Sequence, residues 1–273
     1  MTVQQVALTT GANSGIGLAT TLELARRGLR SVGTVRTQKK ASVVAEAAEA
    51  NGLVIEMAIL DVTDSRACER IIQRYQPTVV VNNAGYSATG AIEDMGDEEV
   101  RMALETMVVA PMRLARLALP HMRKIRTGRI VNVSSIYGRA TTPLTDWYQA
   151  SKHALEGASD ALRAEVAGDG IKVVLVEPGF VRTGIWDEVE DEVQGRAGSG
   201  FGPSYQRLLA NTRMANPIMS DPSKVADVIA TSVTSRHPRT RYLVGRDAQV
   251  IAGLQAYTPT RVWDRVARTV LDL

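Results

Sequence analysis

The sequence has few of the residues that build disulfides, metal sites and aromatic surfaces. It contains one cysteine, three histidines and only 4% aromatic residues among 273. The single cysteine, Cys68, excludes an internal disulfide and is typical of a reducing compartment, so we expect a cytoplasmic protein. Because Cys68 falls on an expected helix, it is interpreted as a buried structural thiol. His121, His153 and His237 lie far apart without metal-ligand spacing, and we expect no metal site.

Long apolar runs and dense charge are also missing. No uninterrupted apolar stretch is long enough to span a membrane, and the first residues do not resemble a signal peptide. The formal net charge is +3, without a basic tail or interleaved aromatic and basic residues. We therefore expect no membrane span and no nucleic-acid partner. A short basic run, Arg236, Arg239 and Arg241, is interpreted as a solvated turn.

What the sequence does contain is a regular alternation of strand-like and helix-like segments. The strand-like segments are continuous runs rich in valine and isoleucine, as in parallel sheets covered on both faces. Right-handed crossovers then predict an α/β, doubly wound parallel sheet with helices on both faces and ligands beyond the carboxyl ends of its strands. Strands are expected at 3–9, 31–36, 53–60, 78–82, 128–134, 171–176 and 242–244. Helices are expected at 16–27, 39–50, 65–75, 97–126 in one or two pieces, 146–167, from 220 onward and at 262–271.

A glycine-rich turn separates the first expected strand from the first helix. Its glycines are Gly11, Gly15 and Gly17, in the spacing Gly-x-x-x-Gly-x-Gly. Gly11 permits a tight turn, Gly15 lets the backbone approach a pyrophosphate, and Gly17 lets the helix pack close to the strand. The helix N-terminus would then hold the phosphate charge. This pattern, in a strand-turn-helix context, predicts a dinucleotide site.

The end of the second strand bears on the choice of dinucleotide. An acidic residue there would hold the adenosine ribose and favour NAD, but the sequence runs Thr34-Val35-Arg36-Thr37. Arg36 can pair with a 2′-phosphate, and Lys39 or Lys40 can add positive charge. We therefore expect NADP(H) to be favoured over NAD(H), the alternative being that Arg36 is a surface residue without a ligand.

Tyr148 and Lys152 have a spacing that suits proton transfer. On a helix, positions i and i+4 lie on one face, one turn apart. A nearby ammonium favours the phenolate, so Lys152 is expected to lower the pKa of Tyr148 towards the working range. Asp146 is expected to cap the helix that carries both residues.

Taken together, these motifs closely resemble the short-chain dehydrogenase/reductase family, in particular 17β-hydroxysteroid and retinol dehydrogenases. The resemblance rests on Thr10 to Gly17, Leu60-Asp61-Val62, Asn82-Asn83-Ala84-Gly85, Ser134-Ser135, Tyr148-x-x-x-Lys152 and Pro178 to Thr183. It implies one Rossmann-type domain over 1–273 that interconverts a carbonyl and an alcohol by hydride transfer, with a small, hydrophobic alcohol or ketone as substrate. It also implies a homodimer or homotetramer, formed through the helices at 97–126 and 146–167.

The resemblance also implies residue roles. Tyr148 is the general acid or base, Lys152 lowers its pKa and binds the nicotinamide ribose, and Ser135 polarises the substrate oxygen. The implied cofactor-binding residues are Gly11, Asn13, Ser14, Gly15, Ile16, Gly17, Arg36, Asp61, Val62, Asn83, Ala84, Gly85, Tyr148, Lys152, Pro178, Gly179, Val181 and Thr183.

Two features leave alternatives open. Many family members have an asparagine, which holds a water beside the lysine, where alignment by eye puts Met107. Met107 is either a tolerated replacement or a sign of slow or lost turnover, in which case the protein is a nucleotide-binding regulator. Residues 184–217 interrupt the strand–helix alternation and form either a mobile lid over the substrate or a disordered insertion. Ile185, Trp186, Phe201 and Tyr205 in this region line an apolar pocket or are packing residues.

Overall fold

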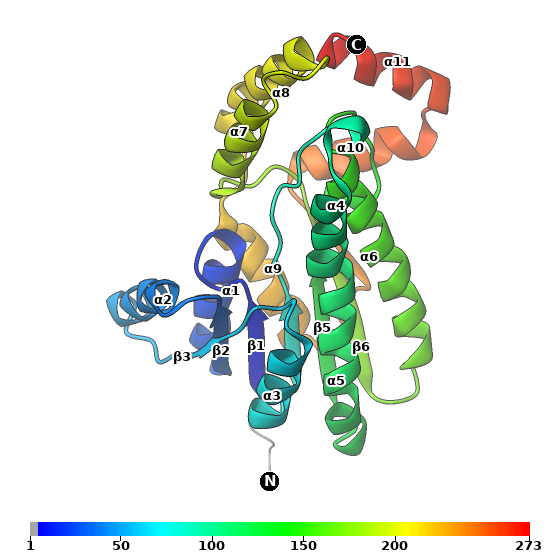
Figure 1. The fold of residues 1–273 in the computed structure, drawn as a ribbon. Coiled ribbons are helices and arrows are strands. Elements are labelled where there is room, and N and C mark those ends of the chain that lie inside the picture. Colours follow the sequence, from blue (N-terminus) through cyan, green and yellow to red (C-terminus); the bar gives the residue numbers. More distant parts are fainter. Residues whose placement is uncertain (1–4) are drawn as a thin grey trace.

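The computed structural model describes residues 5–273 and contains one seven-stranded sheet in the order β3-β2-β1-β4-β5-β6-β7 (Figure 1). Every pair of neighbouring strands is parallel. The strand order reverses beside β1, and a crevice for ligands forms at such a switch point. The strands are β1 (Val6–Thr10), β2 (Arg30–Val35), β3 (Glu56–Ile59), β4 (Val79–Asn82), β5 (Gly128–Val133), β6 (Ile171–Pro178) and β7 (Arg241–Val244).

Helices cover both faces of the sheet. One hydrophobic cluster joins α3, α5 and α6 to side chains such as Leu8, Val80 and Ile130. A second cluster joins α1 and α9 to the opposite side chains of the same strands, including Val79 and Val131. The helices are α1 (Gly15–Arg26), α2 (Gln38–Ala50), α3 (Ser65–Tyr75), α4 (Asp97–Leu104), α5 (Ala110–Lys124), α6 (Asp146–Glu165), α7 (Ile185–Gly195), α8 (Gly202–Ala215), α9 (Pro222–Thr234), α10 (Arg246–Tyr257) and α11 (Thr260–Leu271).

These two clusters explain the continuous apolar runs in the strands. Consecutive residues of β4 point to opposite faces, and Val79, Val80 and Val81 are all fully buried. The predicted α/β doubly wound sheet is therefore confirmed. The first expected strand begins at residue 3, and residues 3 and 4 lie outside the described part of the chain.

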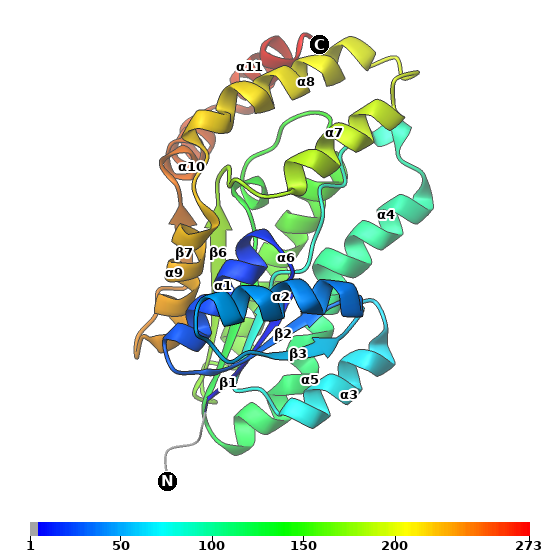
Figure 2. The same cartoon turned by 90° about the vertical axis from the view of Figure 1, so that its left-hand side faces the viewer.

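Two parts of the architecture differ from the expectation. The region 184–217 is not an irregular insertion, because it forms α7 and α8, and α10 lies where no element was expected. Together with α11, these helices lie beyond the carboxyl ends of the strands (Figures 1 and 2). The long helical region does come in two pieces, since a π-helical turn at Glu105–Val109 separates α4 from α5. Among the described residues, no helix is both long and apolar enough to cross a membrane.

Candidate active site

The glycine turn between β1 and α1 has the close backbone approaches that its sequence predicts. Gly11 and Gly15 have φ of 67° and 50°, which L side chains rarely adopt. A Cβ on Gly17 would lie 2.1 Å from the Gly11 carbonyl oxygen, and one on Gly15 would lie 2.8 Å from Cγ2 of Thr183. Only glycine fits at Gly17, where α1 starts against the turn. The turn therefore forms a cradle whose backbone N–H groups and helix N-terminus suit a pyrophosphate.

Asn83, which follows β4, fixes this cradle from the neighbouring strand. Its side-chain amide donates to the carbonyl oxygens of Thr10 at 2.9 Å and Gly11 at 3.3 Å. The Thr10 hydroxyl accepts in turn from the backbone N–H groups of Asn83 and Ala84, each at 3.0 Å. These bonds join the loops after β1 and β4 across the switch point.

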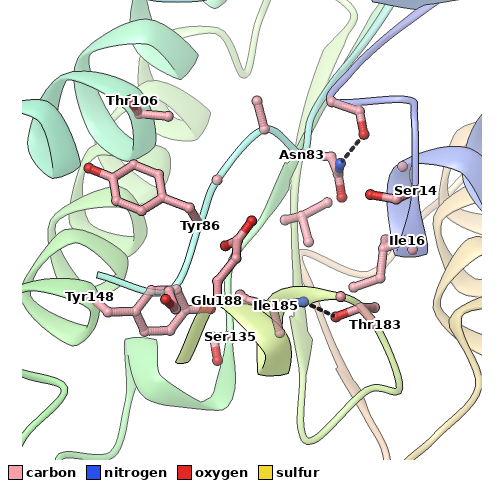
Figure 3. A pocket seen from close by; sticks show the side chains of 18 of the residues that line it. Ser14, Ile16, Asn83, Tyr86, Thr106, Ser135, Tyr148, Thr183, Ile185 and Glu188 are labelled. Carbon is pink, nitrogen blue, oxygen red and sulfur yellow. Dashed lines mark hydrogen bonds between the residues drawn. The ribbon is translucent and has the colours of Figure 1, made fainter. Parts of the chain in front are cut away.

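All of the residues expected to bind the cofactor or to act in catalysis line one cavity of about 430 Å³. The loops after β1, β2, β3, β4, β5 and β6 supply most of its wall. Ser135 and Tyr148 lie on one side, and Ser14 and Ile16 lie on the other (Figure 3). The sequence thus predicted which segments meet, although they are far apart along the chain.

Ser135, Tyr148 and Lys152 form the polar group at one end of the cavity. Ser135 follows β5 and is buried, while Tyr148 and Lys152 lie one turn apart on α6. The Lys152 ammonium is 5.5 Å from the centroid of the Tyr148 ring and donates to the Val133 carbonyl oxygen at 3.0 Å. Tyr137 meets the Tyr148 ring edge-on, with centroids 6.3 Å apart.

The electrostatics of Tyr148 differ from the expectation. Burial raises the pKa of Tyr148 to about 12, although hydrogen bonding by the Ser135 hydroxyl opposes the rise. Burial also lowers the pKa of Lys152 to about 8, against the attraction of Glu156. The expected lowering of the Tyr148 pKa by Lys152 was wrong, because the loss of water on burial dominates at this site. Tyr148 is consequently protonated at neutral pH, as a proton donor must be.

The helix that carries this pair begins differently from the prediction. Its N-cap is Thr145, which makes no side-chain capping bond, and Asp146 is the first helical residue. Burial raises the pKa of Asp146. The prediction that Asp146 caps the helix was therefore wrong by one position.

The opposite end of the cavity is basic. Arg36 and Lys40 line it, whereas Lys39 does not and is exposed. Asp61, after β3, accepts from the Thr63 hydroxyl at 2.7 Å, and this bond is the main reason why the pKa of Asp61 is lowered.

Helix α7 supplies a wall of the cavity, and the sequence did not predict that this segment is a helix. Ile185, Trp186, Glu188 and Val189 line the cavity, and Glu188 lies between its two ends (Figure 3). Burial raises the pKa of Glu188, while Arg36 and Lys40 oppose the rise. The sequence signal for this helix is the alternation of acidic and apolar residues at 185–195. That pattern predicts an amphipathic helix but not its place beside the cavity.

The other aromatic residues of the region serve packing. Phe201 and Tyr205 belong to an apolar cluster with Leu209 and Leu271, away from the cavity lining. The Tyr205 hydroxyl donates to Asp94 at 2.7 Å. Phe201 and Tyr205 are therefore packing residues, whereas Ile185 and Trp186 line the cavity and Trp186 also packs against this cluster.

Two further residues, Met107 and Asp247, have positions that affect the site. Met107, in the π-helical turn, is fully buried in an apolar cluster that includes Tyr148, and it does not line the cavity. Asp247, at the start of α10, accepts from the Phe180 backbone N–H at 2.5 Å, and a Cβ on Gly179 would lie 2.0 Å from the same oxygen. Sequence reasoning missed Asp247 because no helix was expected there.

The prediction for Cys68 is confirmed, whereas the prediction for the basic run is wrong at Arg241. Cys68 is a buried thiol on α3, as expected. Arg241 is not part of a solvated turn, because it forms ion pairs with Glu156, Asp160 and Glu177. Within residues 5–273, no group of potential metal-binding side chains comes together.

Comparison with known proteins agrees with this geometry. Residues 5–194 match the family model described as short chain dehydrogenase. This chain belongs to the short-chain dehydrogenase family. It is accordingly an oxidoreductase of the class that acts on CH–OH groups, and the resemblance seen in its motifs is confirmed.

Its relatives include proteins of different stated activities. The 3-ketodihydrosphingosine reductase of Bacteroides thetaiotaomicron is 36% identical, with 90% of each chain covered. Retinol dehydrogenase 16 of Mus musculus is 32% identical, over 93% of this short-chain dehydrogenase and 85% of the relative. A crystal structure of an actinorhodin polyketide ketoreductase variant with NADPH superposes with a TM-score of 0.78 and 29% identity, over 94% of this chain and 100% of the other.

Proposed function

We propose that this protein interconverts a hydrophobic ketone and its alcohol with NADP(H). The observation that carries the proposal is the shared cavity, in which Ser135, Tyr148 and Lys152 face the glycine cradle that fits a pyrophosphate. When bound, the nicotinamide supplies or accepts the hydride.

The protein's own residues then handle the oxygen and its proton. Tyr148 is protonated at neutral pH and donates its proton to the substrate oxygen during reduction. The Ser135 hydroxyl donates a hydrogen bond to the same oxygen and stabilises its developing charge. Lys152 stabilises the phenolate that remains on Tyr148. In alcohol oxidation the same groups act in reverse.

The preference for NADP(H) rests on charge at the adenosine end of the cavity. Arg36 and Lys40 line that end, and the residue after Arg36 is Thr37 rather than an acid. A guanidinium binds a phosphate through two parallel hydrogen bonds, so this end suits a 2′-phosphate. A related ketoreductase was crystallised with NADPH, which supports the same choice.

A hydrophobic substrate is supported by α7 and by two relatives. Ile185, Trp186 and Val189 give the cavity apolar side chains close to its polar group. The relatives' names give 3-ketodihydrosphingosine and retinol, both of which carry long hydrocarbon parts.

We further propose that α7 is the moving part of a lid over 184–217. We also propose that the protein is a cytoplasmic homodimer or homotetramer formed through α4, α5 and α6.

The proposal is tested with Tyr148→Phe, assayed as NADPH oxidation over a panel of apolar ketones. We expect kcat to fall about 100- to 10,000-fold, the range for general acid catalysis. Tyr242→Phe is the matched control, since Tyr242 lies on β7 outside the cavity lining and its hydroxyl accepts from the Arg239 backbone N–H. Equal turnover by Tyr148→Phe and the parent would refute the assignment.

The cofactor preference is tested separately by titration of tryptophan fluorescence. Arg36→Leu should weaken NADPH binding about 10- to 100-fold, as expected for one charged hydrogen-bonding partner, and leave NADH binding unchanged. Lys39→Leu, which alters a neighbouring cation outside the cavity lining, should change neither. Equal losses for both cofactors would argue against a 2′-phosphate contact.

A further inference from the structure

Four ionisable side chains form one stripe along α6. Tyr148, Lys152, Glu156 and Asp160 follow one another at intervals of four residues, which places them on one face of the helix, one turn apart. The first two belong to the polar end of the cavity. The third, Glu156, is the next side chain after Lys152 and takes no part in the proposed proton transfer to the substrate.

Glu156 is buried, which is costly for a carboxylate. One of its oxygens, Oε2, accepts from Arg241 at 2.9 and 3.2 Å. The other oxygen, Oε1, is also buried and has no such partner. Oε1 and the Ser134 hydroxyl both face the space beside Gly138, since a Cβ on Gly138 would lie 2.7 Å from Ser134 Oγ and 3.2 Å from Oε1. Ser134 in turn lines the cavity.

Arg241 belongs to a network of ion pairs that extends beyond Glu156. It is paired with Asp160 at 2.7 Å and with Glu177 at 3.1 Å. Glu177 is fully buried and also pairs with Arg139 at 2.6 Å, and Asp160 pairs with Arg163 at 2.5 Å. The three arginines and three carboxylates therefore balance in charge, and loss of the Glu156 charge would leave a net positive charge one helical turn from Lys152.

The Lys152 ammonium donates to a neutral group, the Val133 carbonyl, at 3.0 Å. On the side of α4 and α5, Met107 fills the space beside Tyr148 with an apolar side chain. Glu156 is therefore the carboxylate nearest to Lys152 along α6.

We propose that Glu156 is a positioning residue that keeps Lys152 in its charged form during turnover. The inference rests on the proposed function, because it concerns the partner of the lysine in that reaction. Arginines keep their charge in proteins, so Arg139, Arg163 and Arg241 stay cationic at any working pH. Lys152 is the one cation of this group that can release its proton, and neutralising Glu156 would favour that release.

Burial raises the pKa of Glu156, while Ser134 and Arg241 oppose the rise and favour its charged form. Burial lowers the pKa of Lys152 to about 8, and Glu156 is the group that opposes this fall. The lysine is thus mostly charged at pH 7 and loses its charge as the pH rises through about 8. Without the Glu156 charge, the transition would come at a lower pH, within the working range.

The test is Glu156→Gln, which keeps the shape and one hydrogen-bond acceptor but removes the charge. The alkaline limb of the kcat profile should move down by about one to two pH units, as expected for a charge lost one helical turn away. Below that limb, kcat should match the parent. ¹³Cε-lysine NMR of the cofactor-free protein should show the same downward shift for Lys152, whose signal is assigned from its loss in Lys152→Met.

Two further variants separate this role from a structural one. Asp160→Asn removes a carboxylate that contacts the same Arg241 but lies two turns from Lys152, and it should leave the profile unchanged. Glu156→Asp retains the charge, so it should restore most of the parent profile even if Glu156→Gln folds poorly. An unshifted Lys152 titration in Glu156→Gln, or equal shifts in Asp160→Asn, would overturn the inference.

These outcomes are distinct from failure of the proposed function. If the parent oxidises no NADPH with any ketone, the function is wrong, and the NMR titration still decides whether Glu156 sets the charge of Lys152. If the parent is active and the profiles of parent and Glu156→Gln coincide, the function stands and the inference fails.

Discussion

The two walls of the cavity are held in place in different ways. The sheet wall consists of the loops after β1, β4, β5 and β6, and the helical wall consists of Gly184–Val189 at the start of α7. The sheet wall is fixed by close backbone contacts, such as those of Gly17, and by buried bonds such as those of Asn83. The helical wall is fixed by side chains, with Trp186 Nε1 donating to the Val181 carbonyl at 2.7 Å.

A second side-chain contact ties α7 to the loop after β4. Glu192 accepts from the Thr89 backbone N–H at 2.8 Å and from the Ser87 hydroxyl. We therefore expect the sheet wall to stay fixed, whereas the helical wall can open once these side-chain bonds and the packing of Val189 and Val193 against α8 are broken. Substitutions in the two walls should therefore have different effects.

The largest effect is expected for Gly17→Ala in the sheet wall. Its Cβ would lie 2.1 Å from the Gly11 oxygen, so α1 must move away from the turn. We expect the free energy of unfolding to fall by about 1–3 kcal/mol, as for overpacking, with loss of measurable cofactor binding. Urea denaturation and fluorescence titration measure the two effects. Gly157→Ala is the control, because that helical glycine has open space around it and should be stabilised.

The next largest effect is expected for Ser135→Ala. Removing one donor to a developing oxyanion typically costs about 100- to 1,000-fold in kcat. Steady-state assays with an apolar ketone should show this loss with little change in NADPH affinity. Ser42→Ala, on the exposed side of α2, is the matched control. A change confined to KM would mean that Ser135 binds the ketone without stabilising its transition state.

A moderate effect is expected for Glu192→Gln in the helical wall. Weakening its bonds to Thr89 and Ser87 should let α7 open more often, so cofactor dissociation should speed up by about 5- to 30-fold, equivalent to 1–2 kcal/mol. Stopped-flow release of NADPH measures this rate. Asp191→Asn, an exposed neighbour on α7, should leave it unchanged. If Glu192→Gln also abolished binding, the helical wall would be as rigid as the sheet wall.

The smallest effect on turnover is expected for Met107→Asn. The side chain is buried among Ala88, Ala103 and Tyr148 and does not reach the cavity, so kcat should change less than about threefold. Burying an amide there should reduce the free energy of unfolding by about 1–3 kcal/mol. A large gain in kcat would instead support a parent with weakened turnover and a regulatory role.

The sheet wall could be predicted from the sequence, whereas for the helical wall the sequence offered only Ile185 and Trp186, as one of two alternatives. Gly11, Gly15 and Gly17 carry backbone requirements that few other residues satisfy, so their spacing identifies both fold and site. The parallel sheet follows from valine runs such as 79–81, which have to be buried on both faces. Helix α7 has no such requirement, and its place over the cavity depends on long-range contacts such as that of Glu192 with Thr89.

The charged groups mark another limit of sequence reasoning. The Tyr148–Lys152 spacing was recognised correctly, but the direction of the Tyr148 pKa shift was not, because burial depends on the whole fold. Arg241 was placed on a solvated turn because its partners, Glu156 and Glu177, are 64 or more positions away in the sequence. Spacing predicts which groups share a helix face, whereas the sign of a pKa shift depends on packing.

The contact between Asp247 and the Phe180 backbone has a consequence for limited proteolysis. The last two helices follow β7, and they also support the loop after β6 through Asp247 at the start of α10. Cleavage between β7 and α10 would leave the seven strands paired but release Pro178–Val181 from its carboxylate anchor. Nicked protein should therefore lose affinity for the cofactor well before it loses its circular dichroism.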